Sequence, residues 1–207
     1  MAYVGTYPTT PSFSAVNFKV NSTTKETVSE SGRRIRTSVA GTRFSATLKY
    51  PPIKVEDFMS VQAFIAKCQG PLNSFDLVMP TISHSRSGFL GTIEVDGNQS
   101  AGDSTITVTA YDTDSTVAQS KIILKAGDVI RFASHTKVYM VTQDIVTDAS
   151  GDATIDITPS LFENIVTATQ VQHLAVPFRV TLTNDLQEIK YSNNGFVAYE
   201  IDVLEEL

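Results

Sequence analysis

Four arginines lie close together near the start of the chain, in the segment SGRRIRTSVAGTRFSATLKYPP. They are Arg33, Arg34, Arg36 and Arg43. Guanidinium groups bind phosphates, carboxylates and the surfaces of other proteins. The segment could therefore belong to a nucleic-acid site, to half of an active site, or to an interface between protein chains.

The rest of the chain argues against a nucleic-acid site. The net charge is −6, the sequence has no tryptophan, and Phe44 and Tyr50 are the only aromatic residues among the basic ones. Nucleic-acid readers normally combine basic charge with stacking aromatics or with a favourable field over the domain. We therefore expect no direct sequence-specific binding of nucleic acid. We expect an intersubunit interface at the arginines, with a plain solvated strand face as the competing interpretation.

Residues suited to catalysis are present but lack a catalytic context. No G-x-S-x-G motif occurs, and His84, His135 and His173 lie in sequences that match no catalytic motif. Asp112 and Asp114 could act as paired acids on a glycoside. Two carboxylates this close on a turn are more often solvated. We expect no enzyme and no cofactor.

The sequence gives equally little support for a metal site. The single cysteine, Cys68, cannot form an internal disulfide or a cysteine-based zinc site. Asp148, Ser150, Asp152 and Asp156 alternate and could offer oxygens to calcium, but their spacing does not match a calcium loop. Aspartate beside glycine is typical of a hairpin turn. We expect no metal.

The composition favours β-structure. Threonine, serine, valine and isoleucine are abundant, hydrophobic residues make up 42% and charged residues 18%, and this balance is typical of a globular protein. The start of the chain does not resemble a secretory signal, and 18 successive apolar residues occur nowhere. We expect a soluble protein with no membrane partner.

The first ninety residues predict an arm, strands and one helix. Residues 1–13 contain prolines and threonines without an apolar period, so we expect an extended arm that becomes ordered on a neighbouring subunit. A half-buried strand should follow in FSAVNFKVN, and the polar TTKETVSESG should form a turn or loop. RRIRTSV and TRFSATLKY should pair as a hairpin through Gly41, with the arginines on its wetter face.

One helix is expected near residues 54–68. Phe58, Val61, Ile65 and Cys68 recur at helical spacing, acidic residues occupy the first turn, and Gly70-Pro71 follows the last. Cys68 belongs to this apolar stripe, so we expect it to be buried filler. Strand character resumes in SFDLVMP.

After residue 90 the sequence pattern changes and predicts short strands separated by Asp/Gly turns. Residues 91–163 carry eleven acidic and four basic residues, whereas the rest carries eleven and twelve. We expect residues 91–158 to form an acidic small β-barrel or sandwich module. It should be inserted into a discontinuous β-sandwich domain, 14–90 plus 159–207. SLFENIV should form a single helical turn, and GFVAYEIDVLEEL should be a strand with Val197, Tyr199, Ile201 and Val203 on one face.

Two segments share a characteristic order of features. SESGRRIRTSVAGTRFSATLKYPPIKVEDFMSVQAFIAKCQGPLNSFDLVMP combines a basic hairpin, a proline stop, a helix and a strand, and ILKAGDVIRFASHTKVYMVTQDIVTDASGDATIDITPSL is a small β-module with an acidic hairpin. In style and order they resemble structural proteins of the distal tail or baseplate of tailed bacteriophages. The resemblance covers nearly half of the chain and carries over no functional residue.

The resemblance implies a non-enzymatic virion component. It implies an oligomeric ring, commonly of six copies, stacked on the tail tube, with other tail tube and baseplate proteins as partners. The protein would be assembled in the cytoplasm of a bacterial host. Two alternatives stay open: a glycan- or receptor-binding β-sandwich, with Tyr111, Asp112 and Tyr139 as its candidate site, and a neck or tail-completion protein.

Overall fold

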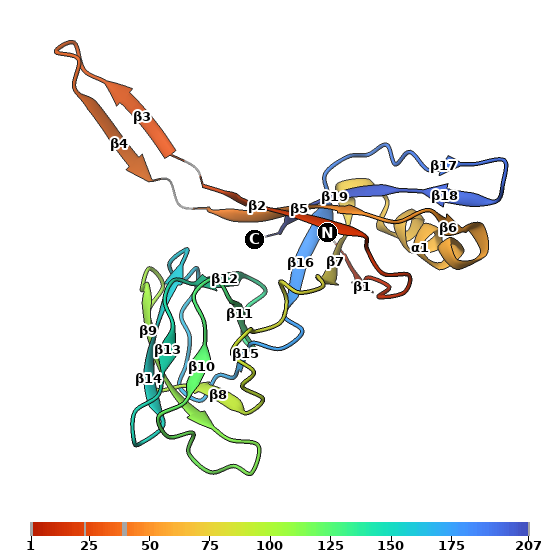
Figure 1. The fold of residues 1–207 in the computed structure, drawn as a ribbon. Coiled ribbons are helices and arrows are strands. Elements are labelled where there is room, and N and C mark those ends of the chain that lie inside the picture. Colours follow the sequence, from red (N-terminus) through yellow and green to blue (C-terminus); the bar gives the residue numbers. More distant parts are fainter. Residues whose placement is uncertain (1, 23, 39–40, 207) are drawn as a thin grey trace. The chain divides into compact units, whose positions relative to one another are not determined.

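A computed structural model describes residues 2–22, 24–38 and 41–206 (Figure 1). Within these residues the chain is mainly β, with one α-helix, as the sequence predicts. The chain divides into two compact units. Unit 1 comprises Met1–Asp76 and Arg179–Leu207, and unit 2 comprises Leu77–Phe178.

Unit 1 is built on a six-stranded sheet with the order β1-β7-β16-β19-β5-β2 (Figure 1). Its strands are β1 Tyr3–Thr6, β2 Ala15–Asn21, β5 Arg43–Lys49, β7 Ser74–Val78, β16 Pro177–Leu182 and β19 Glu200–Glu205. In the central pair, Ile201 lies opposite Leu48 in an antiparallel ladder. Both side chains are buried, because alternate residues of these strands face the core.

A helix covers the core side of this sheet, and a small sheet continues its β5–β19 ladder (Figure 1). The elements are α1 Val55–Cys68, η1 Gly70–Leu72, β6 Ile53–Lys54, β17 Lys190–Tyr191 and β18 Phe196–Ala198. The helix is the predicted one, and its buried residues are the four of the predicted stripe. It ends at Gln69, whose left-handed backbone (φ 55°) reverses the chain.

Aromatic side chains fill the space between helix and sheet. The Phe58 and Tyr199 rings meet edge to face at 5.3 Å, and Phe64 meets Phe75 at 5.4 Å. The predicted alternation of the last strand is confirmed, since Val197, Tyr199, Ile201 and Val203 are all buried. Each such burial contributes about 1.5–3 kcal/mol.

The N-terminal segment packs into unit 1, contrary to the predicted free arm. β1 pairs in parallel with β7, and Tyr7 is only 3% exposed. The Tyr7 ring contacts Phe64 and Phe75. The prediction failed because Tyr7 is buried by residues that are distant in sequence. Burial of this kind requires no apolar period within residues 1–13.

The basic hairpin also differs from its prediction. β4 Arg34–Ser38 pairs with β3 Thr24–Val28, which the sequence suggested was a loop, and not with β5. β5 pairs instead with β2 and β19. The chain reverses between Ser29 and Arg33, so Gly41 is not the hairpin turn.

Unit 2 is a barrel-like module. Its main sheet has the order β15-β11-β12-β14-β9-β8, and β10 pairs with β13. The strands are β8 Thr92–Val95, β9 Thr105–Tyr111, β10 Ile122–Leu124, β11 Val129–Phe132, β12 Val138–Val141, β13 Ile145–Val146, β14 Asp152–Thr158 and β15 Val171–Gln172. A bridge between Glu94 and Gln170 brings the two edges together, so the sheet is nearly closed.

Unit 2 extends beyond the predicted limits of 91 and 158. Leu161, Ile165 and Val171 belong to its buried core, and the Phe89 carbonyl is hydrogen-bonded to His173 at 3.2 Å. The segment SLFENIV is not a helical turn. Leu161 and Ile165 reach the barrel interior from an irregular segment whose amides bond to the 99–103 loop. No helix in the described ranges is long and apolar enough to cross a membrane.

Candidate functional site

The predicted interface arginines are divided between two ladders. Arg33 ends the turn of the β3–β4 hairpin, and Arg34 and Arg36 follow on β4, all exposed. Arg43 begins β5, where it lies opposite Asn21 and is half-buried. The structure therefore groups three of the four arginines on one exposed ribbon.

The β3–β4 hairpin is exposed on both of its faces. Arg34 and Arg36 share a face with Glu26 and Val28, whereas Ile35 and Thr27 point to the other face. Val28 is 57% exposed and Ile35 54%. Because each face carries an apolar side chain that nothing in the described chain covers, the ribbon has no core of its own.

Two guanidinium groups on this ribbon share one carboxylate. The Nε of Arg36 lies 3.0 Å from Glu26 Oε2, and the Nε of Arg34 lies 3.5 Å from Oε1. Arg34 and Arg36 keep more than 60% of their side-chain surface exposed. Exposed pairs of this kind stabilise a fold by less than about 1 kcal/mol, so they do not explain why the ribbon is there.

Sequence reasoning missed the partner strand, β3. Its sequence TKETV is polar apart from its last residue, and every residue is exposed. A strand exposed on both faces shows no apolar alternation, so the usual signal is missing. The β-branched threonines and the SESG turn that follows were the available signs.

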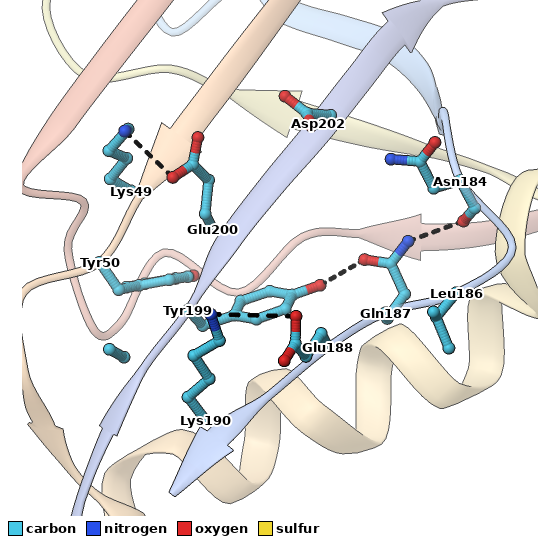
Figure 2. Close-up of a pocket in the computed structure, with 11 residues that line it drawn as sticks. Lys49, Tyr50, Asn184, Leu186, Gln187, Glu188, Lys190, Tyr199, Glu200 and Asp202 are labelled. Atoms are coloured by element: carbon cyan, nitrogen blue, oxygen red, sulfur yellow. Dashed lines mark hydrogen bonds and ion pairs between the residues drawn. The ribbon is translucent and has the colours of Figure 1, made fainter. Parts of the chain in front are cut away.

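Unit 1 also carries a polar pocket of about 430 Å³ (Figure 2). It lies between the ends of β5 and β19 and the 184–190 segment. Tyr199 donates a hydrogen bond to Gln187 Oε1 at 2.6 Å, and Gln187 donates to the Asn184 carbonyl at 2.7 Å. The first bond ties the 184–190 segment to the residue that precedes β19, and the second closes a turn within the segment.

The carboxylates of the pocket already have partners. Glu200 lies directly opposite Lys49 in the β5–β19 ladder, and their charged groups are 3.0 Å apart. Asp202 accepts a hydrogen bond from the Thr47 hydroxyl at 2.6 Å. Cross-strand pairs of this kind stabilise a sheet. The pocket is thus an ion-paired surface, suited to contacting a polar group.

Two phenols that line the pocket, and the thiol of Cys68, are held in their neutral forms. Burial raises the pKa of Tyr50 to about 12 and that of Cys68 to about 11. Burial also raises the pKa of Tyr199. Cys68 is therefore a poor nucleophile, and its burial confirms the prediction that it fills the core.

The three histidines do not come together. His84 is exposed, whereas His135 and His173 are buried at different places in unit 2. The ring of His135 lies 3.3 Å from the Tyr139 hydroxyl, and that of His173 lies between two backbone carbonyls. Burial lowers the pKa of His173, more than the carbonyls raise it.

The aspartates considered as calcium ligands or paired acids have structural partners. Asp148 Oδ1 accepts the Ser150 and Asp152 amides, which is the predicted turn chemistry. No group of three metal-binding side chains occurs among the described residues. Asp112 pairs with Lys121.

The candidate site of the glycan-binding alternative does not form an aromatic platform. Tyr139 is fully buried in the core of unit 2, where its hydroxyl accepts the Phe162 amide at 3.1 Å. It therefore cannot present a ring to a sugar beside Tyr111.

Comparison with known proteins adds nothing to this geometry: no protein-family model matches the chain, and no curated protein is significantly similar to it.

Proposed function

We propose that the protein is a non-enzymatic structural subunit of a bacteriophage tail tip. It forms an oligomeric ring at the distal end of the tail tube or in the baseplate, and it docks neighbouring tail proteins. The observation that carries the proposal is the β3–β4 hairpin, a basic ribbon with exposed apolar residues on both faces.

An isolated two-stranded ribbon is only marginally stable in water. A neighbouring chain would cover Val28 and Ile35 and supply carboxylates to the arginines. Arginine is also among the residues enriched at protein interfaces. A ribbon that lacks a core therefore fits a role in assembly better than a role in stabilising its own subunit.

The six-stranded sheet supports the same role. β1 and β2 are its edge strands, and within the described ranges no further strand pairs with either of them. Open edges invite pairing with another chain. A subunit with two different open edges can join copies head to tail, and such contacts close into rings when the rotation permits.

The first test is the mass of the purified full-length chain. Light scattering after size-exclusion chromatography should show a multimer whose share grows with protein concentration. A chain that remains monomeric at the highest concentrations would contradict the proposal.

The second test places the subunit in the virion. Antibody or gold labelling of the chain in electron micrographs of phage particles should mark the end of the tail next to the tube. Label on the neck, or no label on purified particles, would contradict the assignment to the tail tip.

A further inference from the structure

The outer face of three strands in unit 2 has an unusual composition. Inward residues of β8, β9 and β14 form the barrel core, and the outward ones, apart from Tyr111 at the end of β9, are threonines and acids. We call this surface the threonine–acid face. Its residues are Glu94, Thr105, Thr107, Thr109, Asp152, Thr154 and Asp156.

The threonine–acid face carries negative charge without a cation on its own strands. No lysine or arginine occurs in β8, β9 or β14. Asp152 accepts the Thr109 hydroxyl at 2.7 Å, and Asp156 accepts the Thr105 hydroxyl at 3.0 Å. These neutral donors orient the carboxylates but do not neutralise them.

The β3–β4 hairpin has the opposite excess. Residues 24–38 include four basic and two acidic side chains. Arg34 and Arg36 engage Glu26 through Nε, and their Nη groups make no hydrogen bond within the described ranges. Those Nη groups are the fork that binds carboxylates in a bidentate manner.

We propose that the β3–β4 hairpin of one copy docks on the threonine–acid face of a second copy. Arg34 and Arg36 would bind the carboxylates of Asp152, Asp156 and Glu94. The two surfaces have complementary charge, which steers and orients an association. This inference rests on the proposed function, since it names the contact that joins the copies.

The two surfaces are different parts of the same chain, so the contact is heterologous. Each copy offers one hairpin and one threonine–acid face. Contacts of this type propagate from copy to copy and end in a closed ring or a filament. A symmetric dimer is not required to satisfy either surface.

The test is a set of charge reversals in the full-length chain, measured by light scattering over a range of concentrations. R34E/R36E should raise the apparent dissociation constant of the multimer at least about tenfold. K54E/K190E changes the net charge equally at exposed lysines away from the hairpin, and should leave assembly unchanged. Thermal unfolding should show that both variants remain folded.

The decisive experiment is the restoration of assembly by combining charge reversals on the two surfaces. D152R/D156R should also weaken assembly, and combining it with R34E/R36E should restore it, because the charges are then exchanged between the two surfaces. Wild-type assembly should weaken between about 0.05 M and about 0.5 M salt.

The possible outcomes separate the two proposals. Wild-type multimers that R34E/R36E leaves intact would overturn the docking contact while the assembly role stands. Weakening by both reversals without rescue would also overturn it, because the two surfaces would then have other partners. A monomeric wild-type chain would overturn both proposals.

Discussion

The β2–β5 and β3–β4 ladders are antiparallel pairings of neighbouring chain segments, yet their side chains lie in opposite surroundings. On β5, Phe44 and Leu48 are buried, and the Phe44 ring stacks on that of Phe18. On β4, Ile35 remains 54% exposed. The comparison shows that strand alternation determines which side chains share a face, whereas burial depends on whether another layer covers that face.

The same contrast extends to charged groups. Glu26 binds two arginines in solvent, whereas Asp128 binds Arg86 with its own side chain fully buried. Glu200 and Glu205 repeat the contrast within one strand, β19. Four sets of substitutions test how far the stabilities of these paired environments differ.

The largest effect is expected from truncating the buried member of the ladder pair. Leu48→Ala should lower the free energy of unfolding of unit 1 by about 2–5 kcal/mol, because it leaves a cavity in the core. Ile35→Ala should change it by less than about 0.5 kcal/mol. Urea denaturation with hydrogen exchange of the β5 amides measures both. Equal losses would show that the hairpin has a hidden core.

Asp128→Asn should cost about 1–3 kcal/mol in unit 2, because it removes the charge of a buried carboxylate that accepts hydrogen bonds from Ser85, the Lys125 amide and the half-exposed Arg86. Burial by itself would raise the pKa of Asp128, but hydrogen bonds from Ser85, the Lys125 amide and Arg86 hold it below the usual 3.8. The folded state therefore prefers the carboxylate.

The pH dependence follows from this direction. The contribution of Asp128 is complete above the ordinary pKa of 3.8 and is lost as the pH falls from there through the lowered value. The stability difference between wild type and Asp128→Asn should thus narrow below about pH 4, as urea denaturation at several pH values would show. A difference that widens in acid would reverse the assigned direction.

Within β19, Glu205→Ala should be more costly than Glu200→Ala. Glu205 is buried and accepts the Phe44 amide at 3.0 Å, so its loss leaves that amide without this partner, at about 1–3 kcal/mol. Glu200 forms a half-exposed pair with Lys49 that contributes about 1 kcal/mol or less. Thermal unfolding of the two variants, with Glu205→Gln as the conservative control, ranks them. A larger loss for Glu200→Ala would refute the ranking.

The smallest effect is expected for Glu26→Gln. It removes the shared partner of Arg34 and Arg36, but both pairs are exposed, so the free energy of unfolding should change by less than about 0.5 kcal/mol. Calorimetry of this variant beside Asp128→Asn compares the two environments directly. A loss above about 1 kcal/mol would mean that the ribbon is better protected than its exposure indicates.

The sequence predicts elements whose partners are local. The stripe of α1 and the alternation of the last strand were sufficient, because four residues at helical spacing, or alternate residues of a strand, define a face without outside help. The turn at Asp148 was predictable for the same reason. The predicted mainly β class, with one helix and an inserted barrel-like module, followed from these elements.

Elements that depend on distant partners were not predictable. Tyr7 is buried because Phe64 and Phe75, which are distant in sequence, pack against its ring. Leu161 and Ile165 close the core of unit 2 from an aperiodic segment that suggested a helical turn. For the candidate interface, the arginines were identified correctly as an exposed group apart from Arg43, but their strand partner was not, because β3 has no apolar pattern.

The junction between the units has an evolutionary consequence. Asp76 and Arg179, where unit 1 is interrupted and resumes, are joined by an ion pair of 2.7 Å, so the polypeptide departs and returns at a single place. A gene segment spliced in or out at this point would leave the strand order of the host sheet unchanged. An insertion or deletion at this point would therefore change unit 2 without requiring a redesign of unit 1.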